Sequence, residues 1–261
     1  MLIRDLERRL LELLPASAAE PWDRTGMLVG NPFAEVGDIV VALDPSIETI
    51  KYALGRNANV IVTHHPMFLD PPTSFLPPDT GSDAVGSRIW FALANGLSVL
   101  SFHTALDANP YAATVLSDPL GLTPTDELLE ETPGHAGFGY GRICLCNGRT
   151  ASDLAKSCSA AFGRKPRLWG NPERNVERAC LWTGAAGDAP LQCIQRSIDL
   201  LICGEVKYHT AIDAIECGLS IIEHGHDISE QPHCAVLVKL LEEIGISSNV
   251  IHKMELPENW R

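Results

Sequence analysis

Two adjacent histidines, His64 and His65, follow a short apolar run from Val60 to Thr63 that is rich in β-branched residues. Such a run predicts a buried parallel strand, with both imidazoles at its end. Successive side chains of a strand point to opposite faces, so both rings reach one site only if the backbone turns there. Pro66 favours a turn because it removes a ladder donor and restricts the residue before it. Ligands bind at the carboxyl ends of strands in open α/β sheets, which makes this a candidate site.

Two more histidines follow predicted strands, and each has a carboxylate four residues further on. His103 precedes Asp107, and His226 precedes Glu230. A Gly-Leu-Ser step introduces the predicted strand before each pair, and a helix is predicted after it. This weak internal repeat supports two related halves, each of which delivers one histidine–carboxylate pair just past a strand.

The strand ends therefore carry four imidazoles and two carboxylates. These ligand types suit Zn, Fe, Mn or Ni, and they are too many for one tetrahedral ion with an open position, so the sequence predicts two divalent ions. Glu230 is the candidate bridging ligand, because Ser229 as helix N-cap would put that carboxylate in the first turn, where negative charge is favoured. The candidate metal ligands are His64, His65, His103, Asp107, His226 and Glu230.

Each candidate also has a purely structural interpretation. His64 and His65 are then loop histidines bonded to backbone or water. On the same view His103 is a core histidine, Asp107 caps the next helix and His226 lies in a loop. A structural role for all six at once is the less economical explanation.

Four further polar residues are candidates to support the site: Glu205, Lys207, His209 and Asp44. Glu205 can act as a general base or orient a ligand imidazole, and Lys207 can neutralise an anionic substrate. The alternative is an amphipathic helix in which Glu205 favours the helix start and Lys207 is solvated. Asp44 is expected first to cap the next helix, ahead of a role in the site. The candidate catalytic residues are Glu230, Glu205 and His209.

Composition limits the class of partner. The 261 residues include 45% hydrophobic and 20% charged side chains, which is ordinary for a globular protein. With 20 basic and 33 acidic side chains the net charge is -13, which argues against binding to nucleic-acid backbone or to an anionic membrane surface. A small anionic substrate in a metal-bearing pocket is compatible with this charge.

The sequence predicts a cytoplasmic protein without a membrane span. No stretch approaches the roughly 20 apolar residues of a spanning helix, and segment 1–15 is amphipathic and charged, unlike a secretory signal. The eight cysteines include no C-x-x-C pair and are expected to be reduced thiols. Cys144 and Cys146 should share one face of a strand, where packing is favoured over metal binding.

Strands alternate with helices along the chain, which predicts an α/β protein with two related lobes and mostly parallel sheets. An acidic segment with Pro and Gly at 123–135 marks the boundary, so the expected lobes are 1–125 and 126–261. The loop at 70–82 is expected to be a rim or lid of the site, or a solvated excursion. Expected helices cover 2–14, 46–56, 83–95, 111–121, 150–162, 190–197, 206–217 and 230–244. Expected strands cover 38–43, 60–63, 97–101, 140–146, 177–183, 199–203, 219–223 and 248–252.

Four motifs resemble the NIF-three-like family, whose members are also called dinuclear-metal-centre hexameric proteins or GTP cyclohydrolase 1 type 2 homologues. They are T-H-H-P-M-F at 63–68, H-T-A-L-D at 103–107, C-G-E-V-K-Y-H at 203–209 and G-H-D-I-S-E at 225–230. Trp22-Asp23, followed by G-M-L-V-G at 26–30, is similar to the family's amino-terminal signature. The resemblance thus covers nearly the whole chain.

The resemblance implies a two-lobed α/β subunit, a two-metal site between the lobes and a toroidal homohexamer, without the inserted middle domain of longer members. The family's metal ligands map onto His64, His65, Asp107, His226 and Glu230, with His103 as a further ligand. This chain departs from the family pattern at Arg24, Thr25, Ala105, Asp227 and Ser229. These departures bear on substrate preference more than on metal binding.

The resemblance implies a metal-dependent hydrolase that acts on a nucleotide or phosphoester through a metal-activated bridging water. The family name implies ring opening of a guanine nucleotide, yet neither G-x-x-x-x-G-K-S/T nor G-x-G-x-x-G is present, so a two-metal phosphoesterase is as reasonable. The competing hypothesis is a metal-handling or assembly protein, such as a metal chaperone or insertase, without turnover. The choice among Zn, Fe, Mn and Ni stays open.

Overall fold

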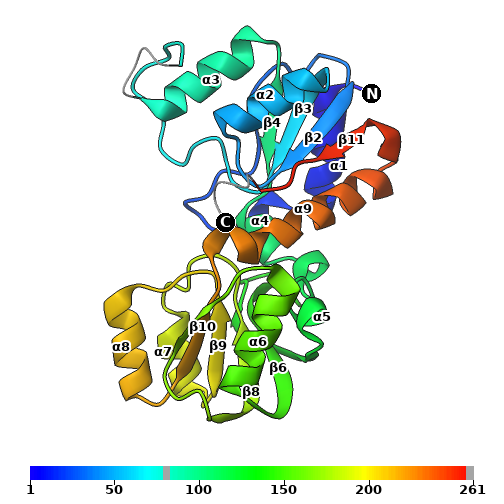
Figure 1. Ribbon diagram of the computed structural model, residues 1–261. Coiled ribbons are helices and arrows are strands. Elements are labelled where there is room, and N and C mark those ends of the chain that lie inside the picture. The colour runs from blue at the N-terminus through cyan, green and yellow to red at the C-terminus, as the bar shows by residue number, and fades with distance from the viewer. Residues whose placement is uncertain (79–82, 257–261) are drawn as a thin grey trace. The chain divides into compact units, whose positions relative to one another are not determined.

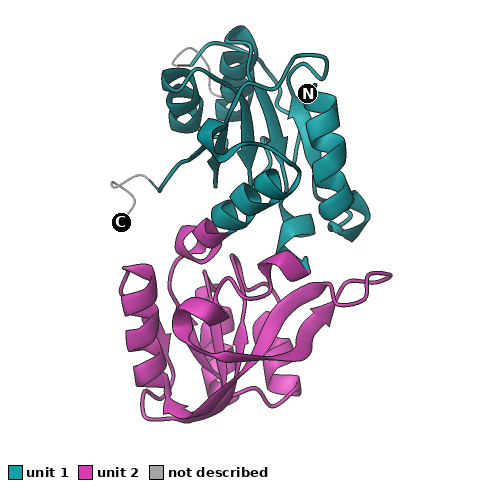
Figure 2. Ribbon diagram, turned by 90° about the vertical axis from the view of Figure 1, so that its right-hand side faces the viewer, with its two compact units in different colours: residues 1–109, 233–256 teal, residues 110–232, 257–261 magenta. Residues whose placement is uncertain are grey.

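The computed structural model describes residues 1–78 and 83–256 (Figure 1). These residues form two compact units, and the described part of the chain holds no third, inserted domain (Figure 2). Unit 1 comprises residues 1–109 and 233–256, and unit 2 comprises residues 110–232. Each unit has one β-sheet with helices against it, which confirms the expected α/β class. None of the helices described is both long and apolar enough to cross a membrane.

The sheet of unit 1 has the strand order β1-β4-β3-β2-β11, and every pair except β1 with β4 is parallel. The central strands are apolar runs buried along nearly their whole length, as in a sheet covered on both faces. Only β1 was not expected, since it is a short edge strand in a segment rich in turn residues. The strands are β1 (Gly26–Val29), β2 (Asp38–Ala42), β3 (Ala58–Thr63), β4 (Ser98–Ser101) and β11 (Ile251–Lys253).

The first helix of unit 1 packs through one apolar stripe. It buries Ile3, Leu6 and Leu10, while Leu2 and Leu13 are only partly buried. The helices are α1 (Ile3–Leu13), α2 (Ile47–Gly55), α3 (Ala84–Ala94) and α4 (Thr104–Asp107), with a 3-10 turn at Ala16–Ala18.

An irregular loop joins β3 to α3. Asp83 caps α3 by accepting from the Gly86 amide at 2.9 Å, and it also accepts from the Thr73 amide at 2.8 Å. One carboxylate thus fixes both the helix start and part of the loop. Residues 79–82 of the expected lid lie outside the described residues, and the role of the loop stays a prediction.

The sheet of unit 2 has the order β5-β6-β8-β9-β10-β7. Only β8-β9 and β9-β10 are parallel, so parallel pairing prevails in unit 1 but not here. Strand β5 occupies the acidic segment that had indicated a boundary: it pairs with β6 and buries Leu128 and Leu129. The strands are β5 (Thr123–Glu131), β6 (Gly139–Thr150), β7 (Arg167–Trp169), β8 (Asn175–Leu181), β9 (Leu200–Cys203) and β10 (Ser220–Glu223).

Helices cover the sheet of unit 2, and most lie where expected. The exception is the helix expected over 111–121, which is instead a 3-10 turn (Pro110–Ala112) and a short α5, since Pro119 would remove a hydrogen bond from a longer helix. Cys144 and Cys146 pack in the core beneath α6, as expected, where burial raises the pKa of their thiols to about 12 and about 11. The helices are α5 (Ser117–Leu120), α6 (Ala151–Phe162), α7 (Ala189–Gln195) and α8 (Tyr208–Glu216).

Helix α9 (His226–Glu243) belongs to both units, because the division falls between Pro232 and His233. After the helix, a 3-10 turn (Ser248–Val250) leads to β11, which pairs in parallel with β2 (Figure 1). The boundary expected at 125/126 had assigned this end of the chain to the second lobe. Strand β11 pairs with β2, which lies more than 200 residues earlier in the chain. The hydrophobic pattern of neighbouring residues does not indicate such a pairing.

Candidate metal centre

His64 is fully buried at the carboxyl end of β3. Its backbone amide extends the parallel ladder to the Ala42 carbonyl at 3.2 Å, and its Nδ1 lies 3.1 Å from the Phe102 carbonyl oxygen just past β4. A carbonyl oxygen can only accept, so Nδ1 carries the proton and Nε2 carries the lone pair. The neighbouring strand end thereby leaves Nε2 as the atom that His64 could offer to a metal ion.

The backbone turns after β3, as the sequence predicted. Thr63 Oγ1 donates to the His65 carbonyl oxygen at 2.7 Å, and the rings of His64 and His65 lie 5.0 Å apart. The His103 ring lies 5.2 Å from the first and 5.5 Å from the second. The two adjacent histidines and the distant His103 therefore form one group of three imidazoles.

Asp44 holds His65 and does not cap α2, so the expected capping role is wrong. Ser46 is the cap, accepting from the Thr49 amide at 3.1 Å. The Asp44 carboxylate instead accepts from His65 Nδ1 at 2.8 Å. An ionised carboxylate can only accept, so His65 also offers Nε2.

Asp23 plays the same part for His103, and sequence reasoning did not assign it a role. Its Oδ1 accepts from His103 Nδ1 at 3.0 Å, and its Oδ2 accepts from the Thr104 amide at 3.0 Å and from the Thr104 hydroxyl. Burial raises the pKa of Asp23, but the hydrogen bonds from His103 and Thr104 outweigh it and lower the pKa to about 2. The carboxylate is therefore ionised and fixes both the ring and the start of α4.

Asp107 is the last residue of α4. Its side chain is 10% exposed, and its Oδ1 lies 3.6 Å from His64 Nε2. The same oxygen lies 2.8 Å from Nε2 of His233, a buried residue of α9. No sequence pattern pointed to His233, because it lies inside a helix and not at a strand end.

The distances within this group suit metal coordination. The ligand atoms of His64, His65 and His103 lie within 4.8 Å of one another, and so do those of His64, Asp107 and His233. Two atoms that are each about 2.1 Å from one ion lie about 3.0–3.4 Å apart in right-angled to tetrahedral geometry. The separation of 3.6 Å between His64 Nε2 and Asp107 Oδ1 is close to that range. Imidazoles with a carboxylate are also the donors that first-row divalent ions prefer.

In unit 2, the start of α9 presents His226 and Glu230, four residues apart, on one face. His226 Nε2 lies 3.0 Å from Glu230 Oε2, and His226 Nδ1 lies 3.0 Å from Glu205 Oε1. Glu205 precedes α8, which begins at Tyr208, so the helix-start interpretation does not describe it. Its carboxylate is placed to orient the His226 imidazole, and this role stays a prediction.

Ser229 is not the N-cap of α9, because the helix begins three residues earlier. Its Oγ donates to the His226 carbonyl at 2.7 Å and accepts from the Gly184 amide at 2.8 Å. Gly184 has a φ of +62°, and a Cβ at this position would meet the Glu230 carboxylate. The loop after β8 therefore packs its backbone directly against Glu230.

Asp227, one of the departures from the family pattern, forms an ion pair in unit 2. Its two oxygens accept from the Arg164 guanidinium at 2.6 and 2.8 Å. A bidentate pair of this kind fixes the orientation of both partners. It ties the segment after α6 to the first turn of α9, next to His226.

Lys207 and His209 lie at the exposed start of α8. Lys207 is the N-cap residue and makes no capping bond through its side chain. The ring of His209 meets the Tyr208 ring edge-on at 5.3 Å. Their roles toward a substrate stay predictions.

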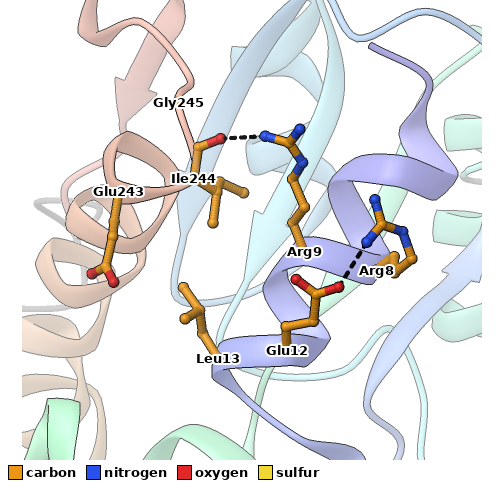
Figure 3. A pocket seen from close by; sticks show the side chains of 7 residues that line it. All are labelled: Arg8, Arg9, Glu12, Leu13, Glu243, Ile244 and Gly245. Carbon is orange, nitrogen blue, oxygen red and sulfur yellow. Dashed lines mark hydrogen bonds and ion pairs between the residues drawn. The ribbon is translucent and has the colours of Figure 1, made fainter.

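A hollow of about 510 Å³ lies in unit 1 between α1 and the segment after α9 (Figure 3). Its two cationic side chains are already engaged: Arg8 pairs with Glu12 at 2.7 Å, and Arg9 donates to the Ile244 carbonyl at 2.9 Å (Figure 3). None of the six candidate ligands lines it, and we assign it no function.

Fold and site together define an α/β protein with side chains at its strand ends that could hold a metal ion. Comparison with models of known protein families identifies the family to which the chain belongs. The model of the Duf34/NIF3 (NGG1p interacting factor 3) family matches residues 1–256, and the chain belongs to this family. The resemblance noted in the sequence is thereby confirmed.

Curated relatives and solved structures extend this comparison. The chain is similar to proteins named GTP cyclohydrolase 1 type 2 homolog, with 27% identity to that of Clostridium acetobutylicum (97% of this chain, 91% of the relative) and 29% to that of Streptomyces coelicolor (89% and 82%). A Staphylococcus aureus hypothetical protein matches with a TM-score of 0.84 at 24% identity (98% and 97% covered). A Bacillus cereus protein related to NIF3 matches with a TM-score of 0.82 at 18% identity (99% and 98% covered). At these identities the solved structures establish the fold alone.

Proposed function

We propose that the protein binds two divalent metal ions through its strand-end imidazoles and carboxylates. One observation carries the proposal: three imidazoles of unit 1 each engage Nδ1 with a carbonyl or carboxylate oxygen, which leaves Nε2 as the ligand atom. In unit 2, His226 Nδ1 likewise lies 3.0 Å from a carboxylate oxygen of Glu205. Metal-binding histidines are held in this way, and an oxygen partner fixes both the tautomer and the ring. The proposed ligands are His64, His65, His103 and Asp107 in unit 1, and His226 and Glu230 in unit 2.

We further propose that the protein is a hydrolase acting on a nucleotide or phosphoester. The names of the curated relatives, GTP cyclohydrolase 1 type 2 homolog, support this class of substrate. When bound, ions of this kind lower the pKa of water and polarise a substrate oxygen. The chain's own part is to hold the ligand rings in place, through Asp44, Asp23 and Glu205.

Chelation followed by reloading tests both proposals. Protein reloaded with Zn, Mn, Fe or Ni should hold two ions per chain by mass spectrometry, and hydrolysis of a panel of nucleotides and phosphoesters should follow metal content. Glu230→Gln should lose metal and activity, whereas Glu216→Gln, an exposed change on α8, should keep both. Absence of bound metal would refute the site, and metal without turnover would refute only the hydrolase.

A metal-handling role is the second candidate. Among the residues of the proposed ligand set and their partners, His226 and Glu205 have side chains that are 36% and 55% exposed, which favours exchange of an ion with solvent or an acceptor. On this proposal the loaded protein transfers its metal to a chelating acceptor within minutes and hydrolyses none of the panel. Slow transfer together with turnover would exclude it.

We also propose that the chain assembles as a homohexamer in the cytoplasm. The family resemblance supports the assembly, and eight free thiols suit a reducing compartment. Light scattering should then give six times the 28.3 kDa mass of the chain. A monomer or dimer at micromolar concentration would refute the hexamer.

A further inference from the structure

One histidine of the unit 1 group is held the opposite way round from the others. His233 is 1% exposed, and its Nε2 lies 2.8 Å from Asp107 Oδ1. An ionised carboxylate can only accept, so the proton of His233 is on Nε2. Its Nδ1 is buried and finds no hydrogen-bond partner in the described parts of the chain.

This orientation argues against His233 as a metal ligand. A ligating imidazole gives its second N–H to an oxygen, as the four histidines of the proposed site do. If Nε2 of His233 bound an ion, the proton would have to sit on Nδ1, where it would be buried without an acceptor. Burying an unsatisfied donor is unfavourable, so the ring is better suited to donate than to ligate.

We propose that His233 is a positioning residue that donates its Nε2–H to Asp107 and fixes this carboxylate beside His64. The His64 and His233 rings meet edge to face, with centroids 4.7 Å apart at 86°. His64 Nε2 and His233 Nε2 approach the same oxygen of Asp107, at 3.6 and 2.8 Å. The inference rests on the proposed metal site, because the carboxylate has to be held for an ion.

Helix α9 determines where this donor lies. His233 follows Glu230 by three residues and His226 by seven, a spacing that puts all three on one face of the helix. The helix that carries two proposed ligands thus also carries the group that orients a third. A change in the position of this helix would therefore alter how Asp107 is presented.

Two substitutions can distinguish whether His233 donates a hydrogen bond to Asp107 or binds the metal ion itself. His233→Leu removes the donor, whereas His233→Gln retains an N–H near the position of Nε2 and has no imidazole. With Zn²⁺ as the probe and a chromophoric chelator as competitor, we expect His233→Leu to bind about 10–100-fold more weakly. His233→Gln should bind within about threefold of the wild type, and X-ray absorption should count the same number of imidazoles around zinc in both.

Other outcomes would overturn the inference. Loss of one imidazole from the zinc shell in His233→Gln would make His233 a ligand. Unchanged affinity in His233→Leu would make the contact merely structural. His252→Leu is the matched control, because His252 also bonds a carboxylate, that of Asp38, outside the group. Failure of the wild-type protein to bind zinc would refute the metal site itself, which is a different result from the two outcomes that concern His233. If His233→Leu does not fold, His233→Gln still tests the inference.

Discussion

The histidines of the site could be predicted from the sequence, whereas most of the groups that orient their rings could not. His64, His65 and His103 could be predicted because each ends a recognisable apolar strand. Asp23 could not, because it lies in a turn-rich segment 80 residues before its partner His103, and only the similarity of Trp22-Asp23 to a family signature pointed to it. The bonds that orient a ligand ring depend on which strand ends become neighbours, which is a property of the fold.

Asp44→Asn should weaken metal binding, because a neutral amide holds His65 Nδ1 less firmly than a carboxylate does. We expect about 10–100-fold lower zinc affinity by calorimetric titration. Asp38→Asn is the control, since Asp38 also bonds a histidine but lies outside the group. Equal losses in the two variants would contradict the assigned role.

Gly184→Ala should displace the Glu230 carboxylate, because the added Cβ would meet it. Gly187→Ala is a matched control: its φ of +50° carries a similar backbone cost, about 1–2 kcal/mol, but its Cβ would meet nothing within 4 Å. Thermal unfolding should show similar losses, whereas mass spectrometry should show reduced metal content only for Gly184→Ala. Full metal content in that variant would speak against Glu230 as a ligand.

Whole elements were predictable where local signals define them. α6 lies within one residue of its expected bounds, because Thr150 caps it through the Asp153 amide at 3.1 Å and Gly163, with φ of +71°, ends it. β5 was missed because its apolar content is nearly limited to Leu128 and Leu129. Such a strand is stabilised by pairing with β6, which no local window contains.

Asp199 ties the start of β9 to β8 and should make the stability of unit 2 depend on pH. It accepts from the amides of Glu177 and Arg178, both at 3.1 Å, and from Arg174 at 3.0 Å. Burial raises the pKa of this carboxyl, but the hydrogen bonds from Arg178, Arg174 and Glu177 outweigh it, so the pKa lies below its usual value of 3.8. The carboxylate therefore stabilises the fold fully above about pH 4, and this contribution is lost as the pH falls through the folded-state pKa.

Asp199→Asn should lower the free energy of unfolding by about 1–3 kcal/mol at pH 7. In urea titrations the difference from the wild type should shrink as the pH falls below about 4. Asp213→Asn, an exposed change on α8, should show neither effect. A difference that does not vary with pH would refute the assigned contribution of the charge.

At the scale of the whole chain, the alternation of strands and helices predicted the α/β class, and the motifs predicted the family. The alternation did not reveal that unit 1 is built from two separate segments. Its last 24 residues, 233–256, supply both His233 and β11, whose partners lie far back in the sequence. Pairing between segments so far apart produces no periodic pattern in the sequence from which it could be predicted.

Removal of metal should destabilise the whole protein. A ligand that binds only the folded state adds about 2.7 kcal/mol at 100 times its Kd. Zinc added to the stripped protein should therefore raise the midpoint of thermal unfolding in calorimetry. His65→Ala should reduce this rise, and an equal rise in that variant would argue that zinc binds elsewhere.

The split composition of unit 1 has a consequence for synthesis on the ribosome. Domains usually fold in the order in which they emerge. Here the middle unit, residues 110–232, is complete first, while β2 waits at an open sheet edge for Ile251–Lys253. Because His233 is made 126 residues after Asp107, a nascent chain would present Asp107 without its donor until α9 has emerged. We therefore expect metal loading to follow the synthesis of α9 and β11.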